Sequence, residues 1–198
     1  MKLYYAPASP FARKARIVAA VLGLDARLEL VLTDTSNPAD AIRVKNPLGK
    51  IPVLETDDGA SIYDSAVIAA YLDDFSGGGR VIPQDFSARY AALTLEALAD
   101  GVADASILQI YELRMRAENE RSASWVAYQK AKVARVLAYL EAEPPARDFL
   151  GIGQIALACA LGYLDLRFEG AWRADHPKLV AWLDAFAIAI PAFAATAA

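Results

Sequence analysis

Three consecutive glycines, Gly77–Gly79, divide the sequence into two stretches whose apolar residues follow different patterns. A glycine run favours a linker because each glycine has wide backbone freedom. Before this run, short alternating segments predict strands, and apolar residues three to four positions apart predict helices. After Pro83 the alternation disappears and only the helical spacing remains. The sequence therefore predicts an α/β domain over residues 1–76 and an all-helical domain over residues 84–198.

The first stretch predicts a compact unit in the order strand, helix, strand, irregular or helical segment, strand, strand, helix. Ser9-Pro10 is typical of an N-cap followed by the first helical residue, and Asp64 is typical of a second N-cap. Asn46–Gly49 and Asp57–Gly59 carry turn chemistry on either side of the third strand. The four strands are expected at 2–5, 27–32, 51–54 and 60–62.

The second stretch predicts a bundle of helices. The apolar spacing favours helices at 87–115, 122–141 and 155–164, and a further helix opened by Pro177. The 155–164 run is apolar nearly all round, which is typical of a helix at the centre of a bundle. Cys159, in the middle of this run, is expected to be buried and inert. The alanine-rich C-terminus is expected to fray.

The composition excludes several kinds of site. Cys159 is the only cysteine, so an internal disulfide, a Cys-x-x-Cys redox pair and a thiolate metal site are impossible. His176 is the only histidine, and we expect no bound metal. A net charge of -4 without a lysine and arginine cluster makes nucleic acid and anionic membranes poor partners. With no signal peptide and no membrane span in view, we expect a cytoplasmic protein.

Four motifs, in their order and spacing, resemble the glutathione S-transferase family, and most of all its small bacterial members of poorly defined activity. The motifs are Ser9–Lys14, Asn46–Leu54, Asp64–Ser65 and Ala156–Asp165. The resemblance covers almost the whole chain. It implies a thioredoxin-like glutathione-binding domain followed by a helical bundle domain.

Ser9 has two interpretations. On the first, its hydroxyl caps the following helix by accepting a bond from a free backbone N–H. On the second, which the resemblance implies, the hydroxyl donates a hydrogen bond to the thiolate of glutathione and Ser9 is the catalytic residue. Because a free thiol has a pKa near 8.5, a donor and a helix N-terminus both favour the reactive anion. Both interpretations stay open.

The resemblance also assigns residues to the rest of glutathione. Ile51, held before a cis Pro52, would bond to the cysteinyl part through its backbone, and Lys50 would neutralise the glycyl carboxylate. Asp64 and Ser65 would hold the γ-glutamyl group, the Asp carboxylate facing its ammonium. As a helix cap and a turn lysine, Asp64 and Lys50 also have ordinary structural explanations.

Two further groups of residues complete the expected site. Asp100 resembles an Asp that, in some classes of the family, reaches across a dimer interface to the γ-glutamyl ammonium of the partner's site; a solvated helix face is the alternative. Phe11, Ile107 and Tyr111 could line a pocket for an apolar electrophile, although such residues at helical spacing are usually core.

The resemblance implies an enzyme that conjugates glutathione, its co-substrate, to a small hydrophobic electrophile in detoxification. The apolar content of 56% also agrees with a homodimer, since some of it can lie in a subunit interface. Two alternatives remain: a glutathione-binding protein with little catalysis in a stress or interaction role, and a glutathione-dependent peroxidase or reductase.

Overall fold

A computed structural model describes all residues, 1–198. The chain begins with four strands and three helices in the predicted order, and the segment expected to be irregular or helical contains one short helix. The strands are β1 Lys2–Tyr5, β2 Glu29–Leu32, β3 Val53–Glu55 and β4 Ser61–Ile62. The helices are α1 Pro10–Val21, α2 Ile42–Lys45 and α3 Ser65–Phe75, with a 3₁₀ turn at Asp25–Arg27.

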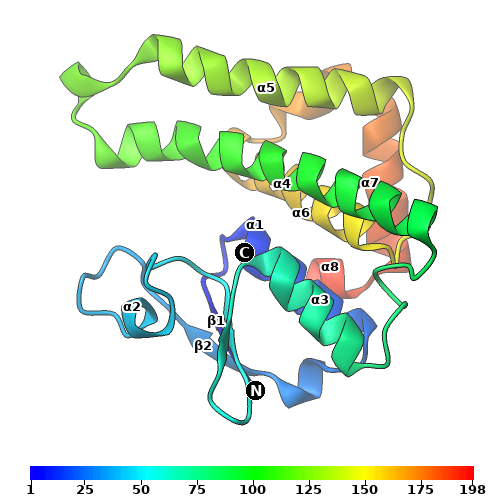
Figure 1. Cartoon of the computed structure of the whole chain (residues 1–198). Coiled ribbons are helices and arrows are strands. Elements are labelled where there is room, and N and C mark those ends of the chain that lie inside the picture. Colours follow the sequence, from blue (N-terminus) through cyan, green and yellow to red (C-terminus); the bar gives the residue numbers. More distant parts are fainter.

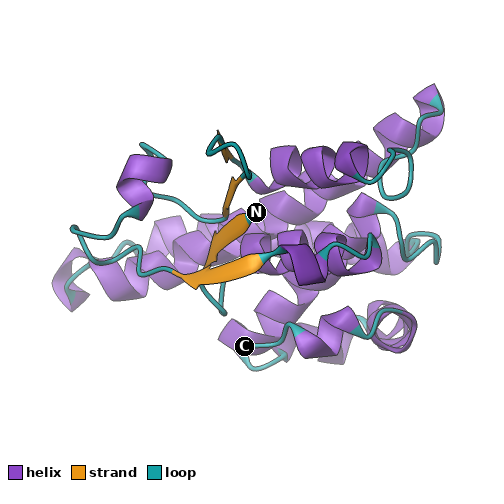
Figure 2. Cartoon of the chain, turned by 90° about the horizontal axis from the view of Figure 1, so that it is seen from below, coloured by secondary structure: helices purple, strands orange, loops and turns teal.

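The strands form one mixed sheet in the order β2-β1-β3-β4. β1 pairs with β2 in parallel, which requires the crossover made by α1, and it pairs with β3 antiparallel. β3 and β4 form an antiparallel hairpin. Viewed from below, the strands lie in front of most of the helices, so the sheet is an outer layer of the molecule (Figure 2).

The rest of the chain contains no strand, as predicted. The helices are α4 Phe86–Met115, α5 Ala123–Ala142, α6 Ile152–Phe168, α7 Pro177–Ala189 and α8 Ala192–Ala195, with 3₁₀ turns at Glu118–Glu120 and Ala171–Asp175. α4 and α5 run side by side as an upper layer above the blue-to-cyan sheet domain (Figure 1). The predicted class, a thioredoxin-like domain followed by a helical bundle, is confirmed.

α6 is the centre of the molecule. It packs against α4 on one side and α1 on the other, so one helix closes the cores of both halves. Ile155, Leu157 and Leu161 on α6 are fully buried, and they share one apolar cluster with Leu3 and Leu54 of the sheet. Burial of such a side chain contributes about 1.5–3 kcal/mol each. Cys159 is buried in the same helix, as predicted.

The linker is held by a single carboxylate. Asp73, near the end of α3 and almost fully buried, accepts hydrogen bonds from four consecutive backbone N–H groups. Their distances to its two oxygens are 2.9 Å for Gly79, 3.0 Å for Arg80, 3.0 Å for Val81 and 3.3 Å for Ile82. The glycine run is therefore fixed at its C-terminal end, and the bonds to Val81 and Ile82 satisfy donors that would otherwise be buried without partners.

A buried ion pair joins α1 to α4. The Lys14 ammonium lies 2.8 Å from Glu96 and 2.7 Å from Asp100, and its side chain is only 1% exposed. Burial alone would lower the pKa of Lys14, but the carboxylates of Asp100 and Glu96 outweigh this and raise it. Asp100 is thus bound within its own chain, and a second contact across an interface would have to use its remaining oxygen.

The C-terminus was expected to fray, and this prediction is wrong. Pro191 starts a last short helix, α8, which returns to lie next to α1, in red below the long helices of Figure 1. Arg13 fixes it: Nη2 donates to the Phe193 carbonyl at 2.5 Å and Nε to the Thr196 hydroxyl at 3.3 Å. The guanidinium also covers the Phe193 ring, 3.9 Å from its centroid. Of the helices described, none is long and apolar enough to span a bilayer.

Candidate functional site

The sheet topology brings three of the predicted segments to one end of the sheet. In the antiparallel pair of β1 and β3, Tyr4 lies opposite Val53, so the loop after β1 with Ser9 starts next to Pro52. β4 is antiparallel to β3, and its last residue Ile62 therefore finishes at the same end, shortly before Asp64.

The N-termini of α1 and α3 both begin at this end. Ser9 caps α1 by accepting a hydrogen bond from the Ala12 N–H at 3.2 Å. Asp64 caps α3 by accepting one from the Ala66 N–H at 3.1 Å, and Ser65 follows, buried in the first turn. Free N–H groups and the helix dipole make each helix start weakly positive, and two of them side by side favour an anionic ligand.

The two interpretations of Ser9 are compatible in this geometry. In the cap bond the hydroxyl oxygen is the acceptor, which leaves the hydroxyl hydrogen free to donate to another group. Ser9 can therefore cap α1 and donate to a bound anion in the same conformation.

The loop before β3 has the backbone form that the resemblance implies. The Ile51-Pro52 peptide is cis. Buried Asn46 holds the turn by donating from its side-chain amide to the Lys50 carbonyl at 3.0 Å and accepting from Leu48 N–H at 3.0 Å. The Lys50 side chain is exposed beside this turn.

α4 places acidic groups over the same end of the sheet. Burial raises the pKa of Asp104; Lys50 and Lys14 oppose this, and the Asp64 carboxylate adds to it. Asp104 is not among the residues predicted from the sequence; Asp100, which is, lies one helical turn earlier and is bonded to Lys14. The signal in the sequence that points to Asp104 is its position four residues after Asp100, which places both acids on the same face of α4.

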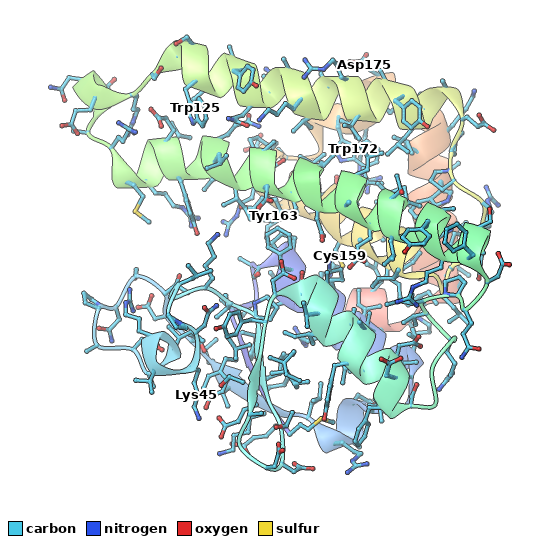
Figure 3. The ribbon with its side chains drawn as sticks, viewed as in Figure 1. Lys45, Trp125, Cys159, Tyr163, Trp172 and Asp175 are labelled. Carbon is cyan, nitrogen blue, oxygen red and sulfur yellow. The ribbon has the colours of Figure 1, made fainter.

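A cavity of about 210 Å³ opens next to Ser9, between α1, α6 and the C-terminal residues. Besides Ser9, it is lined by Arg13, Cys159, Tyr163 and Asp165 among others. Figure 3 shows Tyr163 and Cys159 where the helical layer meets the sheet domain. Burial raises the pKa of the Cys159 thiol to about 12, so this thiol is neutral and inert.

The residues predicted to line an electrophile pocket lie elsewhere on α1 and α4. Phe11, Ile107 and Tyr111 are not among the residues that line the cavity next to Ser9. Phe11 packs against the apolar core, and Tyr111 is 45% exposed on α4. Burial is the main cause of the raised Tyr163 pKa.

No three His, Cys, Asp or Glu side chains lie close enough to hold a metal ion. The only histidine, His176, is held by a hydrogen bond of 2.6 Å between its Nδ1 and the Trp172 carbonyl. A larger hollow of about 590 Å³ lies at the other end of α1, away from Ser9.

Comparison with known proteins adds to this geometry. Residues 3–79 match the description "Glutathione S-transferase, N-terminal domain", and residues 94–185 match "Glutathione S-transferase, C-terminal domain". A curated relative is the uncharacterized GST-like protein YibF of Escherichia coli K12, 33% identical over 185 residues that cover 91% of this chain and 90% of YibF.

Two solved structures, both of a glutathione transferase family member from Pseudomonas fluorescens Pf-5, are similar over 99% of this chain and 98% of theirs. One contains bound glutathione and has 42% identity and a TM-score of 0.91. The other contains bound S-(propanoic acid)-glutathione and has 43% identity and a TM-score of 0.88.

Proposed function

Because this chain belongs to the glutathione S-transferase family, we propose that it conjugates the thiolate of glutathione to a small electrophile. The observation that carries this proposal is the Ser9 hydroxyl at the start of α1, with its hydrogen free, at the end of the sheet where α3 also begins. The relative of known structure that contains glutathione supports it.

In this proposal residues 1–76 bind glutathione and residues 84–198 supply the helical wall of the site. The cysteinyl backbone pairs with Ile51 before cis Pro52, and Lys50 faces the glycyl carboxylate. The γ-glutamyl carboxylate lies at Ser65 and the start of α3, where backbone N–H groups are free. Its ammonium faces Asp64, with Asp104 as a second acid near by.

The reactivity of bound glutathione depends on the charge of its sulfur. The free thiol, with a pKa near 8.5, is mostly protonated at neutral pH, and only the thiolate is a strong nucleophile. A hydrogen bond from Ser9 and the positive end of α1 both favour the anion. Holding an electrophile next to this thiolate replaces a bimolecular encounter by a reaction within one complex. Detoxification would be the role of such an activity.

Two other functions would use the same site. One is glutathione binding with little catalysis, and the other is reduction of a peroxide or disulfide by bound glutathione. A buried, neutral Cys159 offers no second reactive thiol for the latter. Reaction rates with a panel of aryl halides, activated alkenes and peroxides distinguish these two functions from conjugation. We expect conjugation of the electrophiles and no reduction of the peroxides.

Replacing Asp64 by asparagine is expected to weaken glutathione binding by about 1–2 kcal/mol, because one charge-assisted bond is lost at an exposed position. An asparagine oxygen can still accept from the Ala66 N–H, so the cap of α3 is kept. Asp85→Asn, at the cap of α4, is the matched control. Calorimetric titration measures both; equal affinity in Asp64→Asn and wild type would remove Asp64 from the site.

We also propose a two-fold homodimer built on α3 and α4. Apolar side chains remain exposed there: Val67 and Phe75 on α3, and Phe86 and Tyr90 on α4. Asp100, with one oxygen outside its bond to Lys14, would face the partner's site across this interface.

Sedimentation at micromolar concentration is expected to give twice the chain mass of 21.3 kDa. Val67→Asp should shift the equilibrium to monomer, since a charge would be buried at the interface. Ile188→Asp, at an exposed site on α7, should not shift it. A wild-type monomer would contradict both the dimer and the role of Asp100 in it.

A further inference from the structure

The cavity next to Ser9 contains a cation, Arg13, that forms no ion pair with a carboxylate. Arg13 follows Ser9, the N-cap of α1, by four residues, and both line this cavity. Its bonds use Nε and Nη2 and go to a hydroxyl and a carbonyl, which leaves Nη1 outside both of them. Arg13 therefore brings a full positive charge, with a spare donor, to the cavity that Ser9 lines.

The acidic group in the same cavity is already bound. The Asp165 carboxylate accepts bonds from Arg173 Nε at 2.9 Å and Nη2 at 2.7 Å, and from Trp172 Nε1 at 2.8 Å. Its charge is shared mainly with Arg173. The Cys159 thiol is neutral, and neither Asp165 nor the terminal carboxylate of Ala198, which also lines the cavity, forms an ion pair with Arg13.

The neighbouring residues preserve this arrangement. Gly162 on α6 leaves space for the guanidinium: a Cβ there would lie 2.5 Å from Arg13 Nη1. Arg167, one turn after Tyr163, has its guanidinium 5.7 Å from the centre of the Tyr163 ring and its Nε buried without a partner. A second cation, the Arg167 guanidinium, therefore lies next to the Tyr163 ring, which lines the cavity.

We propose that the electrophile is an α,β-unsaturated carboxylic acid whose carboxylate binds Arg13 in the cavity beside Ser9. This rests on the proposed conjugation reaction and specifies its substrate class. A carboxylate suits a guanidinium edge, and a cavity of about 210 Å³ limits it to a short chain.

In the reaction the thiolate sulfur forms a bond to the β-carbon. The π pair of the alkene moves to the α-carbon, which then takes a proton from water. Glutathione has added across the double bond, and nothing is oxidised or reduced. Arg13 next to the carboxylate stabilises the negative charge that builds up on that side of the molecule.

The first test is binding of two finished conjugates, S-(2-carboxyethyl)glutathione and S-propylglutathione, by calorimetry. Wild type is expected to bind the acid more tightly, and Arg13→Gln to lose at least about tenfold of this preference, as for one charge-assisted bond. Thr196→Val is the control, since it removes one anchor of α8 but keeps the guanidinium; its preference should be unchanged. An Arg13→Gln variant with the wild-type preference would overturn the proposal.

The second test compares monomethyl fumarate with neutral dimethyl fumarate as electrophiles. Arg13→Gln should lower kcat/KM for the acid at least about tenfold more than for the diester, and Arg13→Lys should recover part of the loss. Equal losses for both substrates would make Arg13 only an anchor of α8 and refute the proposal. If neither substrate reacts in wild type, conjugation itself fails, while the binding test still decides the role of Arg13.

Discussion

Replacing Ser9 by alanine is expected to raise the pKa of bound glutathione by roughly one to two units, because one hydrogen bond to an anion is worth about 1.5–3 kcal/mol. The affinity for glutathione should change little, since most contacts proposed here lie at its γ-glutamyl and glycyl ends. The conjugation rate at neutral pH should fall in proportion to the thiolate fraction and recover at alkaline pH. Thiolate absorbance of the complex, followed across pH, measures the shift.

The same substitution also removes the cap of α1, so stability must be separated from chemistry. Ser122 caps α5 with the same geometry, accepting from Trp125 N–H at 3.2 Å, far along the chain from the site. Ser122→Ala should cost a similar free energy of unfolding, about 1 kcal/mol, without changing the thiol titration. If Ser9→Ala also leaves the titration unchanged, Ser9 is only a cap and the thiolate must be stabilised by backbone amides or by Arg13.

Replacing Asp73 by alanine is expected to lower the free energy of unfolding by about 3–5 kcal/mol, among the largest effects of a single substitution. The reason is the number of partners left behind: backbone N–H groups of Gly79, Arg80, Val81 and Ile82 lose their acceptor together. Val81 and Ile82 are themselves buried, so water cannot replace the carboxylate there. Urea unfolding measures the loss.

Two variants sharpen this result. Asp73→Asn keeps the shape and one carbonyl oxygen, and we expect an intermediate loss. Asp74→Ala removes a neighbouring exposed carboxylate at the same end of α3 and should change stability by less than about 1 kcal/mol. Wild-type stability in Asp73→Ala would mean that the linker is held by its apolar residues alone.

The parts of the fold predicted from sequence are those with local causes. Ser9 before Pro10 starts α1, Asp64 starts α3, and the Asp57–Gly59 turn joins β3 and β4, in each case because neighbouring residues satisfy or shape the backbone. The all-round apolar pattern of α6 marked the central helix, although that helix extends beyond the predicted run at both ends.

The unpredicted features depend on contacts between distant residues. A lysine such as Lys14 is typical of a protein surface, but here Glu96 and Asp100 hold it in the interior. The sequence of the C-terminus is typical of a frayed tail, but Arg13 binds Phe193 and Thr196, about 180 positions away, and fixes it. The cavity beside Ser9 has the same origin, because α1, α6 and the C-terminal residues build it jointly. No local pattern places such a cavity.

The most direct test is whether bound glutathione reacts faster than free glutathione. Protein saturated with glutathione is mixed with a reactive aryl halide near pH 6.5, where thiolate in solution is scarce, and product formation is compared with glutathione alone at equal concentration. We expect acceleration of at least about tenfold, the gain from a thiol pKa lowered by one unit, shrinking as pH rises. Saturable glutathione binding with a rate equal to that of free glutathione would contradict conjugation and leave a glutathione-binding protein.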